Sequence, residues 1–277
     1  MECPVCGSGS LDHFASIKTY HLVKCTMCGL IYCDNPQSSL EAAKFYQHLY
    51  DQGEKYTCYE TPDIPRNEEF NDRLEHISQF EPKGRLLDIG CSTGEFLEMA
   101  SRTGRYVVDG IDISSEAVHL ASARLKRNIF CGTVDDIPAE PGSYDVVTAW
   151  EVIEHMSDPG KFLRSIWRLL KPGGLLCLST PNTNKIRNRI PGKPRDLFFI
   201  PPEHLFYFNG KNLCRLATSS GFRPLMIDVS SKRFLRWFSQ HHKVLRRVVH
   251  AGLGIMSGIG MEGYNIVAYG RKVSGGA

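Results

Sequence analysis

The sequence contains no apolar run that approaches the roughly 18 residues needed to cross a bilayer, which excludes an integral helical membrane protein. Charge of one sign is also scarce, because the net charge of +3 is too small to indicate nucleic-acid binding by itself. The amino terminus lacks the basic region and the apolar core of a signal peptide. We therefore expect the ten cysteines to stay in a reducing compartment, with a cytoplasmic location as the default.

The composition is that of an ordinary soluble globular protein, with 42% hydrophobic and 23% charged residues. A chain of 277 residues has room for one α/β domain of about 200 residues and one small accessory module. The sequence therefore predicts two units.

The most informative segment is residues 85–97, RLLDIGCSTGEFL, where an apolar strand meets the start of a helix through a glycine-containing turn. Gly90 permits the sharp turn, and Gly94 lets the backbone approach a ligand. Asp88 stands at the carboxyl end of the strand, where open α/β sheets bind ligands. An anionic pyrophosphate is normally met by a glycine-only GxGxxG turn, whereas this DxGxxxG turn carries a negative charge. It suits a ligand with an ammonium group, such as S-adenosylmethionine.

Four further segments follow the first. Residues 107–112 predict a second strand that ends at Asp112, 22 residues after Gly90, near the roughly 20-residue spacing at which an acidic residue meets ribose hydroxyls. The others are an acidic turn, a strand, and a KPGG turn that enters a further strand, at residues 132–138, 143–150 and 170–179.

Together the five segments resemble the class I S-adenosylmethionine-dependent methyltransferases. The resemblance implies an α/β, Rossmann-like, seven-stranded sheet, with cofactor contacts at Asp88, Gly90, Cys91, Gly94, Asp112, Ile113, Val134, Asp135 and Trp150. Thr133 stands where the family often has an acidic residue for the adenine, so this contact is expected from the Val134 backbone and Asp135. A second departure is Ser92, at a position where the family usually has glycine.

Two CxxC pairs near the amino terminus have the spacing of a four-cysteine zinc ribbon. Each pair is followed by a glycine, and 18 residues separate the pairs, which are formed by Cys3, Cys6, Cys25 and Cys28. Four thiolates fill a tetrahedral shell, so the expected zinc is structural. The alternatives are four buried thiols or a redox pair, and Cys33 is a nearby substitute ligand. The ribbon could hold a partner, cover the active site or bind nucleic acid.

A candidate reaction centre follows the fourth strand of the predicted domain. Glu151, Glu154 and His155 stand at positions i, i+3 and i+4 of an expected helix, which predicts that all three share one face. With His204 they resemble the ligands of metal-dependent O-methyltransferases of the ubiquinone pathway and of small-RNA ends. Magnesium or manganese suits the carboxylates and zinc suits the histidines. In the metal-free alternative, His155 is a base or a structural group and His204 only bounds the site.

The predicted organisation has three parts. They are a zinc ribbon at 1–37, a helical linker or cap at 38–82, and the methyltransferase domain at 83–277, with substrate-side insertions at 182–208 and 230–263. Residues 232–250 are basic and amphipathic. This segment is either a helix packed on the domain or a contact for an anionic membrane, a nucleotide-linked substrate or RNA.

The expected activity is O-methylation of a hydroxylated small molecule, such as a sugar, glycolipid or phenol, with or without a divalent ion. Zinc ribbons ahead of this domain resemble those of sugar and natural-product methyltransferases, some of which methylate carbon or nitrogen of a nucleotide sugar. An RNA methyltransferase is the second hypothesis. A non-catalytic zinc-binding adaptor is the third.

Overall fold

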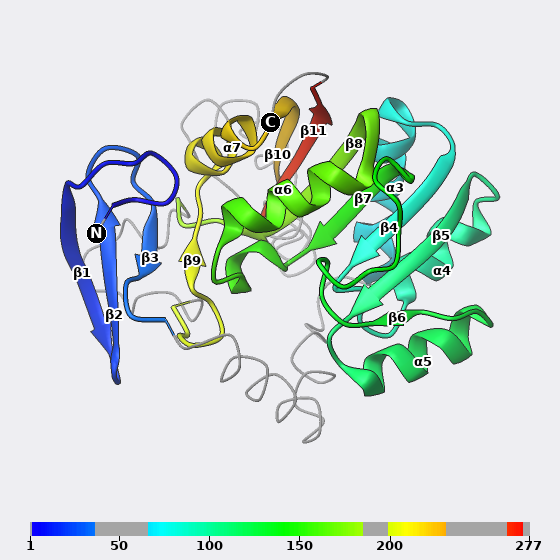
Figure 1. The fold of residues 1–277 in the computed structure, drawn as a ribbon, viewed down its shortest axis with the longest axis horizontal. Coiled ribbons are helices and arrows are strands. Elements are labelled where there is room, and N and C mark those ends of the chain that lie inside the picture. The colour runs from blue at the N-terminus through cyan, green and yellow to red at the C-terminus, as the bar shows by residue number, and fades with distance from the viewer. Residues whose placement is uncertain (1, 37–65, 185–198, 231–264, 274–277) are drawn as a thin grey trace, which may run out of the picture.

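In the computed structural model, four stretches of the chain are described: residues 2–36, 66–184, 199–230 and 265–273 (Figure 1). Several predicted features lie wholly or partly outside them, namely the basic segment 232–250, the cap at 38–82 before residue 66, and parts of the insertions at 182–208 and 230–263. Within the described stretches, no helix has both the length and the apolar character needed to span a membrane.

The main sheet has seven strands in the order β10-β11-β8-β7-β4-β5-β6. Strands β4 to β8 pair in parallel, and β11 lies antiparallel to both of its neighbours. The bounds are β4 Gly84–Ile89, β5 Tyr106–Asp112, β6 Phe130–Cys131, β7 Tyr144–Trp150, β8 Leu170–Pro181, β10 Phe222–Ser230 and β11 Asn265–Lys272. The predicted seven-stranded Rossmann-like sheet is confirmed.

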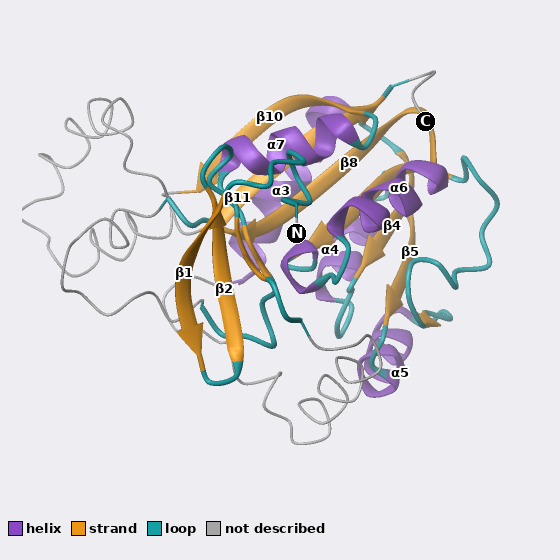
Figure 2. Cartoon of the chain, turned by 60° about the vertical axis from the view of Figure 1, so that its left-hand side comes forward, coloured by secondary structure: helices purple, strands orange, loops and turns teal. Residues whose placement is uncertain are grey.

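Helices cover both faces of this sheet, as Figure 2 shows. Their bounds are α3 Arg66–Phe80, α4 Glu95–Arg102, α5 Ser115–Leu125, α6 Pro159–Leu169 and α7 Gly210–Ser219. Side-chain caps begin three of them, because Ser114, Asp158 and Asn209 each accept a hydrogen bond from a backbone N–H of the first turn. Local sequence therefore determines where these helices start.

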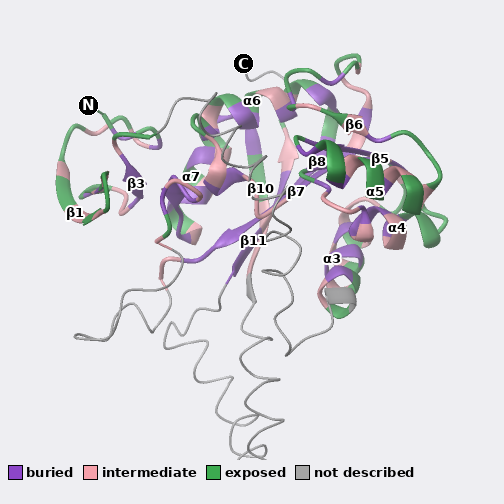
Figure 3. Cartoon of the chain, turned by 90° about the horizontal axis from the view of Figure 1, so that it is seen from below, coloured by how far each residue is buried: buried purple, intermediate pink, exposed green. Residues whose placement is uncertain are grey.

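Alternation along the strands divides the core into two layers. Leu86 packs with the apolar residues of α3 and α4. Its neighbour Leu87 packs with those of α6 and α7. Buried residues follow the strands and the inner faces of the helices, and exposed residues lie outside (Figure 3). The chain order reverses between β4 and β7, which places a ligand site at their carboxyl ends.

The amino-terminal module forms a second sheet with the strand order β1-β2-β3-β9. Its strands are β1 Leu11–Ile17, β2 Tyr20–Cys25, β3 Ile31–Cys33 and β9 Phe206–Tyr207. The fourth strand comes from the methyltransferase part of the chain and lies beside the ribbon in Figure 1. Residues of both parts also share one hydrophobic cluster. The ribbon therefore shares a sheet and a hydrophobic core with the segment 199–208 and is not an independently packed domain.

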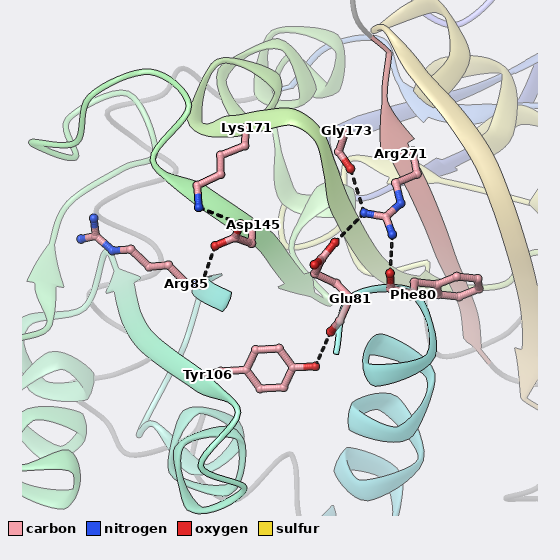
Figure 4. Close-up of polar contacts among 8 residues, drawn as sticks. All are labelled: Phe80, Glu81, Arg85, Tyr106, Asp145, Lys171, Gly173 and Arg271. Atoms are coloured by element: carbon pink, nitrogen blue, oxygen red, sulfur yellow. Dashed lines mark hydrogen bonds and ion pairs between the residues drawn. The ribbon is translucent and has the colours of Figure 1, made fainter. Parts of the chain in front are cut away.

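Arg271 of β11 joins three parts of the molecule at the amino-terminal end of the parallel strands (Figure 4). Its guanidinium donates to the Glu81 carboxylate at 2.7 Å, to the Gly173 carbonyl at 2.8 Å and to the Phe80 carbonyl. The Tyr106 hydroxyl donates to the Glu81 carbonyl at 2.7 Å. These contacts hold the end of α3 against the sheet.

Replacing Arg271 by Ala should lower the free energy of unfolding by about 2 kcal/mol, because hydrogen bonds from a charged donor to a partly buried acceptor are lost. Urea unfolding of the full chain measures this change. The matched control is Arg102→Ala, since Arg102 makes only an exposed ion pair with Glu98 and its loss should cost no more than about 0.5 kcal/mol. Equal effects of the two substitutions would contradict the role of Arg271.

Candidate active site

The turn after β4 has a left-handed backbone at three positions. The φ angles are 71° at Gly90, 49° at Ser92 and 79° at Gly94. Gly94 is the N-cap of α4, which begins at Glu95. Ser92 adopts a conformation that disfavours any side chain, which explains why the family usually has glycine there.

The Asp112 carboxylate holds this turn in place. One oxygen accepts the Ser92 N–H at 2.8 Å, and the other accepts the Ser114 N–H at 2.9 Å. Asp112 is only 4% exposed. Its carboxylate thus ties the turn to the start of α5.

Two glycines of the site are required by space as well as by φ. A Cβ at Gly90 would lie 2.6 Å from Val152 Cγ2. A Cβ at Gly94 would lie 3.1 Å from the Ala121 Cβ. The turn is therefore packed directly against Val152, two residues after the end of β7, and against α5.

Asp88 is buried at the end of β4 and accepts the Thr148 hydroxyl at 2.6 Å. Burial raises the pKa of this carboxyl to about 7, while the Thr148 hydrogen bond and the charge of Arg73 act in the opposite direction. A cation placed beside Asp88 would stabilise the ionised form. This is the electrostatic behaviour expected of a group that receives an ammonium.

Arg73 of α3 is a site residue that the sequence reasoning missed. It is 5% exposed and pairs with Glu69, and its guanidinium carbon lies 4.4 Å from the Trp150 ring centroid. Within the described residues, Arg73 Nε and Trp150 Nε1 are buried and have no hydrogen-bond partner. The available signal was an arginine inside the apolar stripe of α3, between Phe70 and Ile77.

The remaining predicted cofactor residues have different surroundings. Ile113 is 45% exposed directly after Asp112, and Val134 is buried in the acidic turn. The Cys91 side chain faces the core, where a Cβ on Gly110 would lie 3.0 Å from its sulfur. The Asp135 carboxylate binds Lys161 and Ser165 of α6, which leaves the backbone of the turn for a ligand.

Glu154, His155 and His204 come together after β7. Their ligand atoms all lie within 4.8 Å of one another, and Glu154 is 1% exposed. The two imidazole rings are 4.8 Å apart between centroids. His155 Nδ1 donates to the Glu203 carbonyl at 2.6 Å, which leaves Nε2 as the ligand nitrogen. One carboxylate and two imidazoles are a donor set that fits a divalent cation.

The prediction that Glu151 shares a face with Glu154 and His155 was wrong. The expected helix directly after β7 is only a 3₁₀ turn, η1 Ile153–His155. Glu151 lies before this turn and has a left-handed backbone with φ 55°. The Glu151 carboxylate turns toward β8 and β11, where it accepts the Ser179 hydroxyl at 2.6 Å and the Asn265 amide at 3.2 Å. The left-handed backbone separates this carboxylate from the cluster of Glu154, His155 and His204.

The four ribbon cysteines are brought together as predicted. The Cys3 and Cys28 sulfurs are 3.6 Å apart, those of Cys6 and Cys25 are 3.5 Å apart, and all four lie within 4.8 Å. Tetrahedral zinc with Zn–S bonds of about 2.3 Å requires sulfur separations of about 3.8 Å. The spacing is far above that of a disulfide, and the residues present fit the metal.

Cys33 lies apart from the four-cysteine cluster. Its thiol contacts the Asn35 side chain at 3.5 Å. The described residues therefore do not place it as a fifth or substitute ligand.

This strand order and the acidic, glycine-bounded turn at its switch point define the class I S-adenosylmethionine-dependent methyltransferases. A family model described as a methyltransferase domain matches residues 63–226, so the chain belongs to that family. The curated relatives include ubiquinone biosynthesis O-methyltransferases. One from Xanthomonas axonopodis pv. citri is 41% identical over 118 residues, which are 40% of this chain and 49% of the relative.

A second such relative, from Xanthomonas campestris pv. campestris, is 34% identical over 160 residues, 53% of this chain and 66% of its own length. The chain thus spans about half the length of several curated relatives that it matches.

Two solved structures show the same fold. One is an S-adenosylmethionine-dependent methyltransferase from Thermotoga maritima, with TM-score 0.54 and 17% identity, covering 83% of this chain and 99% of that one. The other is phosphoethanolamine N-methyltransferase 2 from Haemonchus contortus, with TM-score 0.55 and 21% identity. The match covers 74% of this chain and 53% of that one.

Replacing Gly90 by Ala should destabilise the protein by about 2 to 4 kcal/mol, because a left-handed backbone and a clash with Val152 both oppose the new Cβ. Urea unfolding measures the loss. In the Val152→Ala background the clash disappears, so only the backbone cost of about 1 kcal/mol should remain. The control is Gly104→Ala, since Gly104 has φ 69° and nothing within 4 Å of a Cβ. A cost as small as that of Gly104→Ala would contradict the clash.

S-adenosylmethionine affinity should rise as the pH rises from about 5.5 to 7, by up to about tenfold per unit, because the ammonium favours the ionised form of Asp88. The stability of the ligand-free protein should change in the opposite direction. Because the Asp88 pKa is raised on folding, this carboxyl stabilises the fold fully below its unfolded pKa near 4, and the stabilisation is lost as the pH rises through about 7. Calorimetric titration across this window tests the first expectation.

Two variants make the pH test specific to Asp88. Asp88→Asn should remove the pH dependence of binding. Thr148→Val should move its midpoint to higher pH, because the hydroxyl that lowers the Asp88 pKa is gone. An unchanged pH profile in Asp88→Asn would refute this assignment.

Proposed function

We propose that this protein methylates a hydroxyl group of a small molecule, with S-adenosylmethionine as the methyl donor and a divalent cation at Glu154, His155 and His204. The observation that carries this proposal is the compact cluster of these three side chains directly after β7. The names of the curated relatives, which are O-methyltransferases, support oxygen as the acceptor atom. A sugar, a glycolipid and a phenol all meet this description.

The donor would lie over the carboxyl ends of β4 and β5. Asp88 would receive its ammonium, and Asp112 its ribose hydroxyls. The exposed Ile113 would pack on the adenine, next to the backbone of Val134. Arg73 offers a buried guanidinium to the carboxylate of the methionine part, because Nε is an unused donor within the described residues.

Transfer of a methyl group from a sulfonium is an in-line displacement, so the acceptor oxygen must be aimed at the methyl and must lose its proton. A bound divalent ion would lower the pKa of an acceptor hydroxyl. The protein supplies orientation, because the Glu203 carbonyl holds the His155 ring through Nδ1. A ring nitrogen that binds the ion has no lone pair left for a proton, so His155 Nε2 or His204 could act as the base only in the metal-free alternative.

We also propose that the amino-terminal cysteines hold a structural zinc. Four sulfur ligands leave no open coordination position, so this metal would contribute to folding and not to methyl transfer. Burial raises the pKa of Cys3 and of Cys28, and a dication offsets this cost by stabilising the thiolates. Reduced thiols fit the cytoplasmic location that we propose for this protein.

Glu154→Gln should weaken Mn²⁺ binding by at least about tenfold and reduce methyl transfer to a catechol probe, 3,4-dihydroxybenzoate, because a charged ligand is lost. Glu151→Gln is the matched control and should change Mn²⁺ affinity less than about twofold, since Glu151 faces Ser179 and Asn265. Electron paramagnetic resonance measures free Mn²⁺, and transfer of a labelled methyl group measures turnover. Methyl transfer that resists EDTA would refute the metal-assisted mechanism.

A further inference from the structure

The backbone of Leu205 joins the ribbon to the candidate reaction centre. Its carbonyl accepts the Cys33 N–H of β3 at 2.8 Å. Its own N–H donates to the Glu154 carbonyl at 2.8 Å. Leu205 is 3% exposed, so both hydrogen bonds are shielded from water. One residue thus connects a strand of the ribbon with a member of the Glu154, His155 and His204 cluster.

All three members of this cluster depend on residues 203–205. Glu154 is bound through the Leu205 N–H, and the His155 ring through the Glu203 carbonyl at 2.6 Å. His204 belongs to the segment itself. A shift of this short segment would therefore move the three ligand groups relative to one another.

The ribbon holds the same segment from the other side. Strand β9 pairs with β3 in the register Ile31–Tyr207 and Tyr32–Phe206. The Tyr32 and Phe206 rings stack with centroids 5.9 Å apart. The Tyr207 hydroxyl donates to the His204 carbonyl at 2.7 Å. Residues 204–207 are thus bound along their length by the ribbon strand or by one another.

The cysteine cluster determines where β3 lies. Strand β2 ends at Cys25, whose N–H donates to the Leu30 carbonyl at 2.8 Å, and β3 begins at the next residue, Ile31. The knuckle of Cys25 and Cys28 therefore forms the connection between β2 and β3. A metal that joined the four sulfurs would cross-link this connection to Cys3 and Cys6.

We propose that the zinc ribbon is a positioning element for the Glu154, His155 and His204 cluster, and that it acts through the Leu205 backbone. The role of the cluster in methyl transfer rests on the function proposed above. The ribbon makes no direct contribution to the reaction. It holds the segment that sets the distance between the two histidines and Glu154.

The cofactor turn provides an internal reference, because its backbone hydrogen bonds go to β5 and not to residues 203–205. Gly90 and Cys91 donate to the Ile111 carbonyl, and Ser92 donates to Asp112. None of these three hydrogen bonds involves the ribbon. S-adenosylmethionine affinity should therefore stay constant when the ribbon is released from residues 203–205.

The test is a pair of substitutions at Cys33 in the full chain. Cys33→Pro removes the N–H that donates to Leu205, whereas Cys33→Ala keeps it and removes only the thiol. The proline variant should bind Mn²⁺ at least about tenfold more weakly than the alanine variant. Both should bind S-adenosylmethionine equally and retain one zinc per chain, measured by calorimetry and elemental analysis.

A second pair covers the case in which Cys33→Pro disrupts the ribbon and loses its zinc. Leu205→Pro removes the N–H that donates to Glu154, and Leu205→Ala keeps it. The proline variant should again weaken Mn²⁺ binding about tenfold while zinc content stays at one per chain. If both proline variants match their alanine controls in Mn²⁺ affinity, the proposal is overturned.

Hydrogen exchange separates this proposal from the proposed metal-assisted function. In both proline variants, and after removal of zinc from the wild type, the amides of residues 150–157 and 203–209 should exchange at least about tenfold faster. The exchange rates of the amides of residues 86–97 should not change. If the wild type binds no Mn²⁺, the metal-assisted function fails, and exchange still decides the coupling. Unchanged exchange in residues 150–157 would refute the coupling by itself.

Discussion

The carboxylate of Asp112 is the constraint on which the cofactor site depends. By accepting the N–H groups of Ser92 and Ser114, it joins the turn after β4 to the start of α5. It also stabilises a left-handed serine where glycine would be more favourable. Because the turn is held this closely, Gly90 packs on Val152, and Val152 leads directly into the cluster that begins at Glu154. Val152 is thus the point where the cofactor turn touches the segment that leads to the reaction centre.

Two buried groups set the electrostatics of the site. Asp88 has a raised pKa because it is removed from water, and Arg73 lies close enough to lower that pKa in part. A methyl donor carries both an ammonium and a carboxylate, so these two groups can each meet an opposite charge. The ribbon lies at a different place, since its strand β3 pairs with β9 in the segment that carries His204.

Much of the fold could be predicted from the sequence because its signals are local. The turn around Gly90 and the strand that ends at Asp112 follow from glycine and strand patterning. The ribbon cysteines were found for the same reason. The prediction for Glu151 was wrong because helical spacing was assumed. Glu151 instead has a left-handed backbone, and its carboxylate accepts hydrogen bonds from Ser179 and Asn265, so no helix connects it to Glu154.

The sequence alone determined the strands on either side of the acidic turn and the two CxxC pairs of the ribbon, because each depends on residues near one another in the chain. Only the tertiary structure decided which groups meet. It put Arg73 on Trp150 and turned Glu151 away from His155. It also paired β3 with β9, so that Leu205 lies between ribbon and reaction centre. Such contacts join residues far apart in the chain, and their geometry depends on packing that no local pattern encodes.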